Sequence, residues 1–322
     1  MMTSNYMRAI KATFGAILRQ RSNAILAAAL IAAAASPVAL AADKQKTFGS
    51  PEEAVKALVT ATTAGDVKAL ESILGPGSAN LVRSGDAVAD RTGRERFAKA
   101  YAEANKIGRE GDAKAVLLVG KDEWPMPIPL VKDAAGWRFD TKQGKEEILN
   151  RRVGRNELSA VQAMLAYVDA QREYYLRNPR GDKLLHYAQK FGSAPGKRDG
   201  LYFPTKAGEP PSPLGPLFAT AKAQGYTKDG DDLPDPYHGY RYRILKRQGQ
   251  DAPGGAYDYV VQGSMIGGFA LIAWPASYGS SGVMTFIVNH DGVVYEKNLG
   301  SGTATAVGKI TRFNPDKTWK RH

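Results

Sequence analysis

The 322-residue chain contains no cysteine, and this absence excludes several classes of protein at once. Without thiols there is no disulfide scaffold, no cysteine nucleophile, no thiolate zinc site and no iron–sulfur cluster. Histidine is also rare. The chain has four, which are His186, His238, His290 and His322. The first half of the chain therefore has no imidazole for general acid–base chemistry.

Acidic residues are absent from positions 1–42, which carry four basic residues followed by an apolar run over 24–35. Ala39-Leu40-Ala41 then supplies small residues at a plausible cleavage site, the order typical of a secretory signal peptide. The run is shorter than the roughly 20 residues that span a bilayer. We therefore predict export to the periplasm and no transmembrane segment after cleavage. The alternative is an uncleaved anchor; a prepilin leader is rejected because Gln20 stands where pilins carry Glu.

Composition is that of an ordinary globular protein, with 43% hydrophobic and 24% charged residues. The length suggests about two domains. The chain carries 44 Lys and Arg and 32 Asp and Glu; without the four basic residues of the leader, 40 against 32 leave a charge of +8. For an exported protein, this charge suits lipid head groups, lipopolysaccharide or cell-wall polymer as partners rather than nucleic acid. It also serves solubility alone.

Helix signals dominate the start of the mature chain. Ser50-Pro51-Glu52-Glu53 predicts a capped helix that ends at Gly65. Asp66 begins a second helix, and a third is predicted near 93–106. Asp86 and Asp90 are interpreted as part of a loop between helices. Three strands follow these helices, at 115–119, 124–131 and 136–140. Pro125, Pro127 and Pro129 remove every donor from one edge of the middle strand, which must therefore lie at a sheet edge or run as polyproline II.

Helices followed by strands with aromatic residues indicate α+β architecture. This order resembles the NTF2-like, or cystatin-like, α+β cone, in which helices and a curved sheet enclose a pocket. The resemblance implies a pocket, and we predict that Phe97, Tyr101, Trp124 and Trp137 line it as binding residues. The alternative is that the same four aromatic side chains are ordinary core packing.

The second half begins with a helical pattern over 146–178. Its predicted apolar stripe consists of Leu158, Val161, Leu165, Val168 and Tyr175. Shorter helical stretches are predicted at 183–191 and 214–225. Alternating or apolar runs at 240–246, 256–262, 269–274, 283–288 and 293–297 then predict an antiparallel meander, and Asp291-Gly292 is a hairpin signal.

A long helix before a meander, with Phe269–Pro275, the glycine-rich Tyr278–Gly282 and Asp291-Gly292-Val293 in its last strands, resembles the soluble domain of pseudopilins and minor pilins. The resemblance implies a pilin-like shape for this half and no particular activity. The missing prepilin leader argues against assembly into a pilus.

Three segments resemble one family across nearly the whole mature chain: Trp124–Val131, Gly136–Asp140 and Glu147–Leu158. They are similar to the exported bacterial family DUF2950, a domain of unknown function. Membership implies export to the cell envelope. It implies no reaction, cofactor or catalytic residue.

Two charged segments invite a binding interpretation. Asp229, Asp231, Asp232 and Asp235 lie within seven positions, but their spacing departs from the EF-hand pattern, so a solvated turn is the default. The strand containing Arg241 and Arg243 is basic, which suits either an anionic surface or an edge strand protected by charge.

The sequence thus predicts a signal peptide at 1–42, an NTF2-like domain at 43–150 and a helix-plus-meander domain at 151–322. The leading functional hypothesis is a non-catalytic periplasmic protein that binds or assembles a component of the cell envelope. The alternative is a hydrolase-like or isomerase-like enzyme with Asp86 or Asp140 as a carboxylate base. We assign no catalytic residue, no metal ligand and no cofactor.

Overall fold

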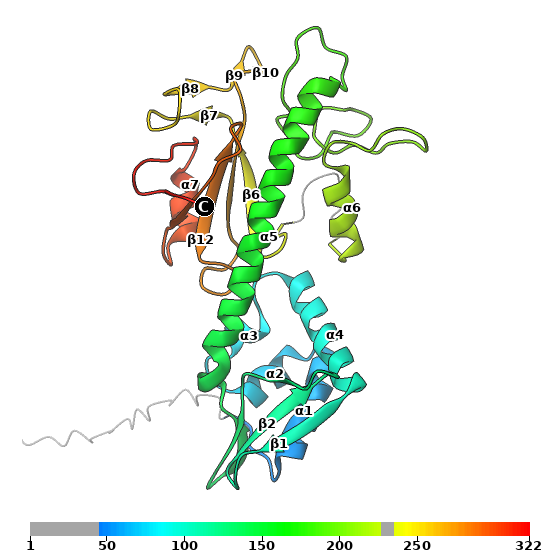
Figure 1. Cartoon of the computed structure of the whole chain (residues 1–322), viewed down its shortest axis with the longest axis vertical. Helices are drawn as coiled ribbons and strands as arrows, with labels where there is room; N and C mark the ends of the chain where they lie inside the picture. Colours follow the sequence, from blue (N-terminus) through cyan, green and yellow to red (C-terminus); the bar gives the residue numbers. More distant parts are fainter. Residues whose placement is uncertain (1–44, 227–234) are drawn as a thin grey trace, which may run out of the picture. The chain divides into compact units, whose positions relative to one another are not determined.

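A computed structural model describes residues 45–226 and 235–322 (Figure 1). Contacts divide the chain into the units Met1–Ala41 and Ala42–His322, and all elements described below belong to the second. The predicted leader at 1–42 lies outside the described residues. The described chain is a mixed α+β structure with antiparallel sheets, as the sequence predicts.

Four helices begin the described chain, and local capping explains where the first two start and end. Ser50 accepts a hydrogen bond from the Glu53 amide, and Gly65 ends the helix in the left-handed conformation. Asp66 caps the second helix through the Ala69 amide. Both predicted helices are therefore confirmed. The four helices are α1 (Pro51–Ala64), α2 (Val67–Leu74), α3 (Ala79–Val82) and α4 (Ala87–Glu103).

The bounds predicted for the third helix are wrong at both ends. α4 begins at Ala87 because Asp86 caps it; Asp86 therefore ends the predicted loop between helices, whereas Asp90 lies inside α4 and its predicted loop position is wrong. The helix ends at Glu103, and the chain then enters a strand that the sequence analysis missed. An Asp followed by helix-forming residues is an N-terminal signal that the pattern at 86–90 does contain.

The first sheet has the order β1-β2-β4-β5. The short β3 also pairs with β2, at residues of β2 that β4 leaves free. Its strands are β1 (Asn105–Arg109), β2 (Lys114–Val119), β3 (Trp124–Pro125), β4 (Leu130–Asp133) and β5 (Gly136–Phe139). The proline-rich segment pairs only briefly. Trp124 and Pro125 lie beside β2, Met126 donates to the Leu117 carbonyl, and the ladder resumes at Leu130. Alternate prolines thus limit residues 124–129 to a short edge pairing, as expected. The expected edge position is wrong for the end of the predicted strand, because Leu130 and Val131 pair with both β2 and β5.

The long helix α5 (Thr141–Arg177) begins five residues before the predicted start and ends at Asn178 in the left-handed conformation. The predicted apolar stripe is wrong in part, because Leu158 is 57% and Leu165 41% exposed. The buried face is instead formed by Ala160, Met164, Tyr167, Gln171 and Tyr174. The periodicity was correct, but the larger aromatic residues rather than the leucines face the sheet.

Residues 178–214 form no helix, so the helix predicted at 183–191 is wrong. This segment is held by long-range contacts. The Tyr187 amide donates to the Met265 carbonyl, and the Gln171 side chain accepts from the Ala188 amide and donates to the Ala188 carbonyl and the Tyr167 hydroxyl. The helix predicted at 214–225 is present as α6 (Gly215–Ala223).

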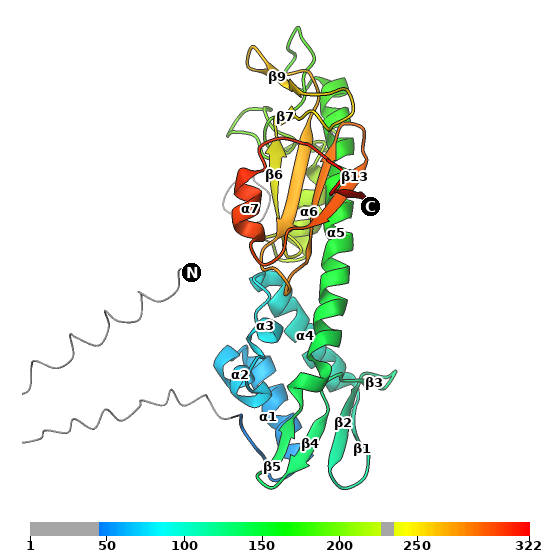
Figure 2. The same cartoon turned by 90° about the vertical axis from the view of Figure 1, so that its left-hand side faces the viewer.

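The second sheet has the order β14-β13-β12-β11-β6 with every pair antiparallel, which confirms the predicted antiparallel meander except for its second strand. The strand predicted at 256–262 is wrong as part of this sheet, because its residues form the short strands Tyr257–Asp258 and Val260–Val261 of two separate sheets. Figure 2 shows the second sheet with α5 on one side and α7 (Thr303–Lys309) on the other. The strands are β6 (Tyr240–Leu245), β11 (Ala270–Pro275), β12 (Met284–Asn289), β13 (Val294–Asn298) and β14 (Lys320–Arg321). Two small two-stranded sheets add β7 (Arg247–Gln248) with β8 (Tyr257–Asp258) and β9 (Val260–Val261) with β10 (Ser264–Met265).

Two main hydrophobic cores lie within this unit. One gathers side chains from α1, α2 and the first sheet, with Ile148 of α5 packed against it. The other gathers α5 residues from Ala160 to Tyr174 with the second sheet. The predicted division between 150 and 151 falls inside α5, and it stays a prediction.

Two glycines of α5 provide a matched test of this packing. A methyl group on Gly144 would collide with the Pro127 carbonyl and lie 2.6 Å from the Ile128 nitrogen, whereas one on Gly154 meets nothing within 4 Å. We expect Gly144→Ala to lower the free energy of unfolding by about 2 kcal/mol or more. Gly154→Ala should raise it by roughly 0.5–1 kcal/mol. Urea unfolding of both variants measures this, and equal effects would contradict the close approach at Gly144.

Candidate functional site

The structure brings three of the four predicted pocket residues to one core. Trp137 on β5 is buried, and Phe97 and Tyr101 on α4 are partly buried against the same cluster. Trp124 on β3 is 43% exposed, and its ring lies 5.2 Å from the Arg151 guanidinium. Their role in binding a ligand stays a prediction.

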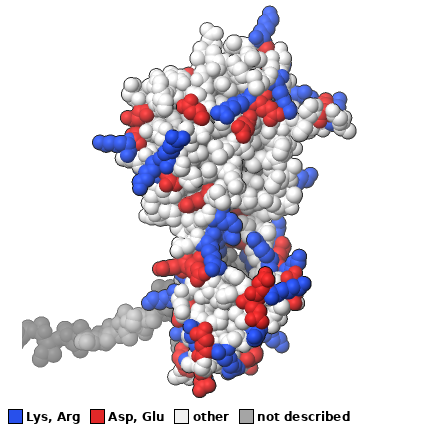
Figure 3. Space-filling view, in the orientation of Figure 1, with Lys and Arg blue, Asp and Glu red and all other residues white. Residues whose placement is uncertain are grey.

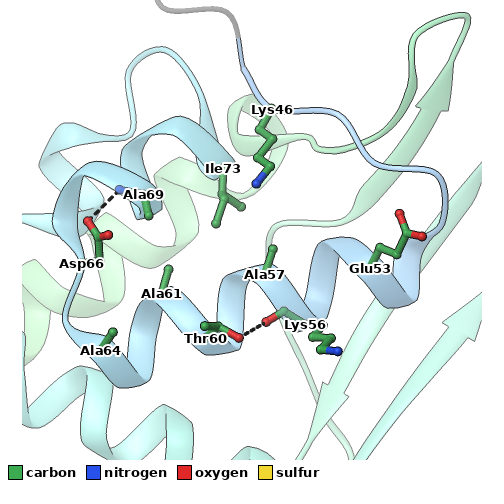
Figure 4. Close-up of a pocket in the computed structure, with 10 residues that line it drawn as sticks. All are labelled: Lys46, Glu53, Lys56, Ala57, Thr60, Ala61, Ala64, Asp66, Ala69 and Ile73. Carbon is green, nitrogen blue, oxygen red and sulfur yellow. Dashed lines mark hydrogen bonds between the residues drawn. The ribbon is translucent and has the colours of Figure 1, made fainter.

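A pocket of about 430 Å³ lies between α1 and α2, and none of the four aromatic residues lines it (Figure 4). Its floor is small and apolar, formed by Ala57, Ala61, Ala69 and Ile73. Some of its polar groups are engaged locally, because Thr60 donates to the Lys56 carbonyl, Asp66 caps α2 and Glu53 accepts from the Gly49 amide. Lys46 and Lys56 add two ammonium groups to the lining, and Figure 4 shows the Lys46 ammonium beside Ile73.

A second pocket of about 230 Å³ lies beside the proline-rich segment. It is lined by Lys114, Val116, Pro125, Met126, Pro127, Pro129, Gln143, Glu147 and Arg151. Its charged residues already form ion pairs, Lys114 with Glu110 and Arg151 with Glu147. Exposed pairs of this kind contribute little to stability and leave the site close to neutral.

Among the described residues, Asp86 is the most buried carboxylate, 1% exposed just before α4. One carboxylate oxygen accepts from the Ala89 amide at 2.9 Å. The other accepts from the Tyr226 hydroxyl and from the Gly239 amide, both at 2.8 Å. We call Asp86, Tyr226, His238 and Gly239 the Asp86 cluster.

Local backbone geometry explains how Gly239 reaches Asp86. Tyr237 and Tyr240 exchange two backbone hydrogen bonds, so His238 and Gly239 form a two-residue hairpin turn. Both have positive φ, 51° and 73°, as a type I′ turn requires. Histidine is among the few non-glycine residues enriched in this region. The turn aims its Gly239 amide at the carboxylate.

Burial controls the protonation of the groups around Asp86. Burial, and then the charge of Asp86, raise the pKa of Tyr226 far above its ordinary value, so its phenol stays a donor. Burial lowers the pKa of His238, although the Asp86 charge opposes this effect and the Arg155 charge adds to it. Burial also raises the pKa of Tyr242. The cluster therefore holds one carboxylate among neutral rings.

A second set of contacts lies beside the Asp86 cluster. Arg152 of α5 donates to the carbonyls of Asn80 and Leu81 at 2.7 and 2.6 Å. Ser280, in the loop between β11 and β12, donates to the same Asn80 carbonyl at 3.0 Å. α3 is thus bonded to α5 and to that loop of the second sheet. Because burial lowers the pKa of Arg152, these carbonyl acceptors offset part of its desolvation.

Both oxygens of Asp86 are occupied by protein donors, so its geometry is that of a structural acceptor. A catalytic base must present an oxygen to the proton that it takes. Asp140, the other predicted candidate, lies at the start of α5 and makes no side-chain capping bond. Sequence reasoning identified Asp86 as a candidate carboxylate but missed its partners Tyr226 and Gly239, which lie 140 and 153 positions away.

The two arginines of the predicted basic strand differ in their surroundings, because Arg243 is directed into the structure and Arg241 is exposed. Arg243 donates to the carbonyls of Val307 and Ile310, and its guanidinium lies 5.5 Å from the Trp274 ring. Arg241 pairs with Asp235 at 3.3 Å. The other three aspartates of the predicted acidic turn lie outside the described residues. In the described parts of the chain, no three His, Asp or Glu side chains are grouped as metal ligands.

The described chain is thus an α+β protein built from two five-stranded antiparallel sheets, two small two-stranded sheets and a helix that packs in both main cores, and comparison with known proteins assigns it to a family. The model of the family described as a protein of unknown function (DUF2950) matches residues 45–322, so the chain belongs to this family. The predicted family resemblance is confirmed. Neither the curated proteins nor the solved structures yield a match. Over residues 45–226 and 235–322, no helix combines the length and apolarity needed to cross a membrane.

The Asp86 cluster can be tested through stability. Asp86→Ala leaves a buried hydroxyl and two backbone amides without their acceptor, and we expect a loss of roughly 3 kcal/mol. Asp66→Ala is the matched control, because Asp66 also caps a helix but is exposed, and should cost about 1 kcal/mol. Chemical unfolding compares the two, and equal losses would show that the Tyr226 and Gly239 contacts contribute nothing.

His238 predicts a specific pH dependence. Its pKa in the folded chain is lowered by burial, so the unfolded chain takes up the proton first as the pH falls through about 6.5. Stability should therefore fall below that pH, until the folded histidine is protonated as well. His238→Asn, which tolerates positive φ, should lose less stability between pH 7.5 and 5. Urea unfolding across this range measures the difference, and parallel curves for the two proteins would refute it.

Proposed function

We propose that this chain is an exported, periplasmic protein that binds or helps to assemble a component of the cell envelope without catalysing a reaction. The leader-like composition of residues 1–42 supports export. The single observation that carries the binding proposal is the distribution of exposed apolar side chains. Of the eight large hydrophobic residues exposed in the described chain, seven lie between Leu158 and Ile266, and only Trp124 lies outside this range.

The small hairpin β9–β10 presents part of this apolar surface. Val260 pairs with Met265 and Val261 with Ser264, and Met265 is buried. Because side chains alternate along a strand, Val261 and Ile266 point to the opposite, outward side. We call Tyr257, Val261 and Ile266, which are 36–48% exposed, the hairpin patch.

The chain segment that carries β9 and β10 is poor in charged residues. Between Asp258 and Asp291 the sequence holds no Lys, Arg, Asp or Glu. The Tyr257 ring lies 3.6 Å from where a Gly267 side chain would begin, which places it beside Ile266. Exposed apolar side chains that cluster often mark interaction sites, whereas scattered single ones are common on any protein surface.

The finer fold assignments belong to the same proposal. Helices α1, α2 and α4 with the sheet β1-β2-β4-β5 support an NTF2-like likeness for residues 43–150. The helix α5 with the meander from β6 to β14 supports a pilin-like likeness for 151–322. Both shapes serve as scaffolds for binding in many settings, so they are compatible with a binding role and do not specify a partner.

The alternative enzyme needs a carboxylate that is poised to take a proton. Asp86 is the buried candidate, and its bonds to Ala89, Tyr226 and Gly239 use both oxygens in holding the chain. A binding function requires only that this cluster hold the chain rigidly. Because Asp86 has no oxygen free of protein donors to accept a substrate proton, we prefer binding to catalysis.

Export and binding are tested separately. Cell fractionation with mass analysis should find a chain in the periplasm that has lost Met1 and the residues up to about Ala41. Full-length protein in the cytosol would overturn export. For binding, the purified mature chain is sedimented with phosphatidylglycerol–phosphatidylethanolamine vesicles, lipopolysaccharide or peptidoglycan sacculi.

We expect retention by at least one of these three materials. The double variant Val261→Asp, Ile266→Asp should weaken that retention about tenfold, because two charges would enter the contact. Thr63→Asp, at an exposed position of α1, is the control that should leave it unchanged. Retention by none of the three materials, or equal loss in both variants, would contradict the proposal.

A further inference from the structure

The helix α5 has a second apolar face that no described residue covers. Leu158, Leu165 and Leu176 are 57%, 41% and 77% exposed. At about 100° of rotation per residue, the three lie within roughly 20° of one another. They also lie about half a turn from Tyr167, at the centre of the buried face. We call Leu158, Leu165, Asp169, Arg172 and Leu176 the outer stripe.

The outer stripe is open in the structure. Figures 1 and 2 show the second sheet along one side of α5, and Figure 3 shows few charged side chains over the middle of the helix. Asp169 is 80% and Arg172 50% exposed, and they form an ion pair at 3.6 Å. Arg172 also donates to the His290 carbonyl. Both charged groups therefore retain exposed atoms for a further partner.

We propose that the outer stripe pairs with the outer stripe of a second copy of this chain, with the two α5 helices antiparallel. One register satisfies all four central positions. When Leu165 of one copy faces Leu176 of the other, Asp169 of the first faces Arg172 of the second. A two-fold axis repeats each contact, which gives two leucine pairs and two ion pairs.

Other arrangements satisfy fewer of these positions. A parallel pair in register places Asp169 against Asp169 and Arg172 against Arg172, which sets like charges together. An antiparallel pair that aligns Leu158 with Leu176 places Leu165 against Asp169. Charge complementarity thus selects the antiparallel register centred between Ala170 and Gln171. This pairing uses the apolar surface of the proposed binding function, but it depends on neither export nor the hairpin patch.

The expected affinity is low. A few leucines on each chain bury well below the roughly 800 Å² per partner of a stable complex. The dimer is therefore best trapped covalently, and the absence of cysteine makes the natural chain a clean background for this experiment. A disulfide forms only between Cα atoms within about 7 Å.

The test uses cysteine substitutions on the purified mature chain under mild oxidation. Leu165→Cys with Leu176→Cys in one chain should give a disulfide-linked dimer, as should a mixture of the two single variants. Each single variant alone should remain largely monomeric, because equivalent positions lie about 16 Å apart along the antiparallel helices. Non-reducing electrophoresis and mass spectrometry measure the products. Single variants that link as readily as the double variant, or a double variant that stays monomeric, would overturn the proposal.

Charge exchange provides the matched control. In the double-cysteine background, Asp169→Arg or Arg172→Asp alone should reduce the yield of linked dimer several-fold, because each sets like charges across the interface. The combined exchange should restore the yield, because the pairing is then reversed but complementary. Failure of the combined exchange to restore it would also refute the antiparallel register. None of these results bears on vesicle, lipopolysaccharide or sacculus binding, so the two proposals can fail independently.

Discussion

The described structure depends on one helix that belongs to two hydrophobic cores. The first turn of α5 packs so closely on the Pro127 carbonyl that only glycine fits at position 144, and Thr141 donates to the Leu74 carbonyl. Further along, Met164, Tyr167 and Tyr174 are buried against the second sheet. Because one continuous helix packs in both cores, the residues between the two contact regions hold the cores at a defined distance along α5.

The Asp86 cluster adds a polar constraint to this apolar one. A charge removed from water is costly unless it is hydrogen-bonded, and Asp86 meets that condition through donors from Ala89, Tyr226 and Gly239. Arg152 does the same with the carbonyls of α3. Polar contacts of this kind specify one arrangement of the chain, because any displacement leaves buried groups without partners. The buried Asp86 and the partly buried Arg152 thus serve to hold parts of the chain in place, whereas the side chains that we propose for binding are exposed and apolar.

Local patterns were enough to predict the elements whose determinants are local. Ser50 and Asp66 cap their helices as expected, and the Asp291-Gly292 turn joins β12 and β13. The errors have non-local causes. The segment at 183–191 has helical periodicity, but the pairing of Tyr187 with Met265 holds it extended. The partners of Asp86 lie more than a hundred residues away, and no spacing in the sequence announces such a contact.

The error in the α5 stripe is informative in a different way. Of the predicted set, Val161 and Val168 are buried, Tyr175 is partly buried, and Leu158 and Leu165 are exposed. A single apolar stripe fits one partner surface, whereas α5 carries apolar groups on opposite sides. The second sheet covers one side, where Tyr167 and Tyr174 are buried, and the predicted stripe did not include these two residues. The other side repeats leucine at intervals of 7 and 11 residues, with an acid and a base between the last two leucines, which is the pattern on which we base the proposed pairing with a second helix.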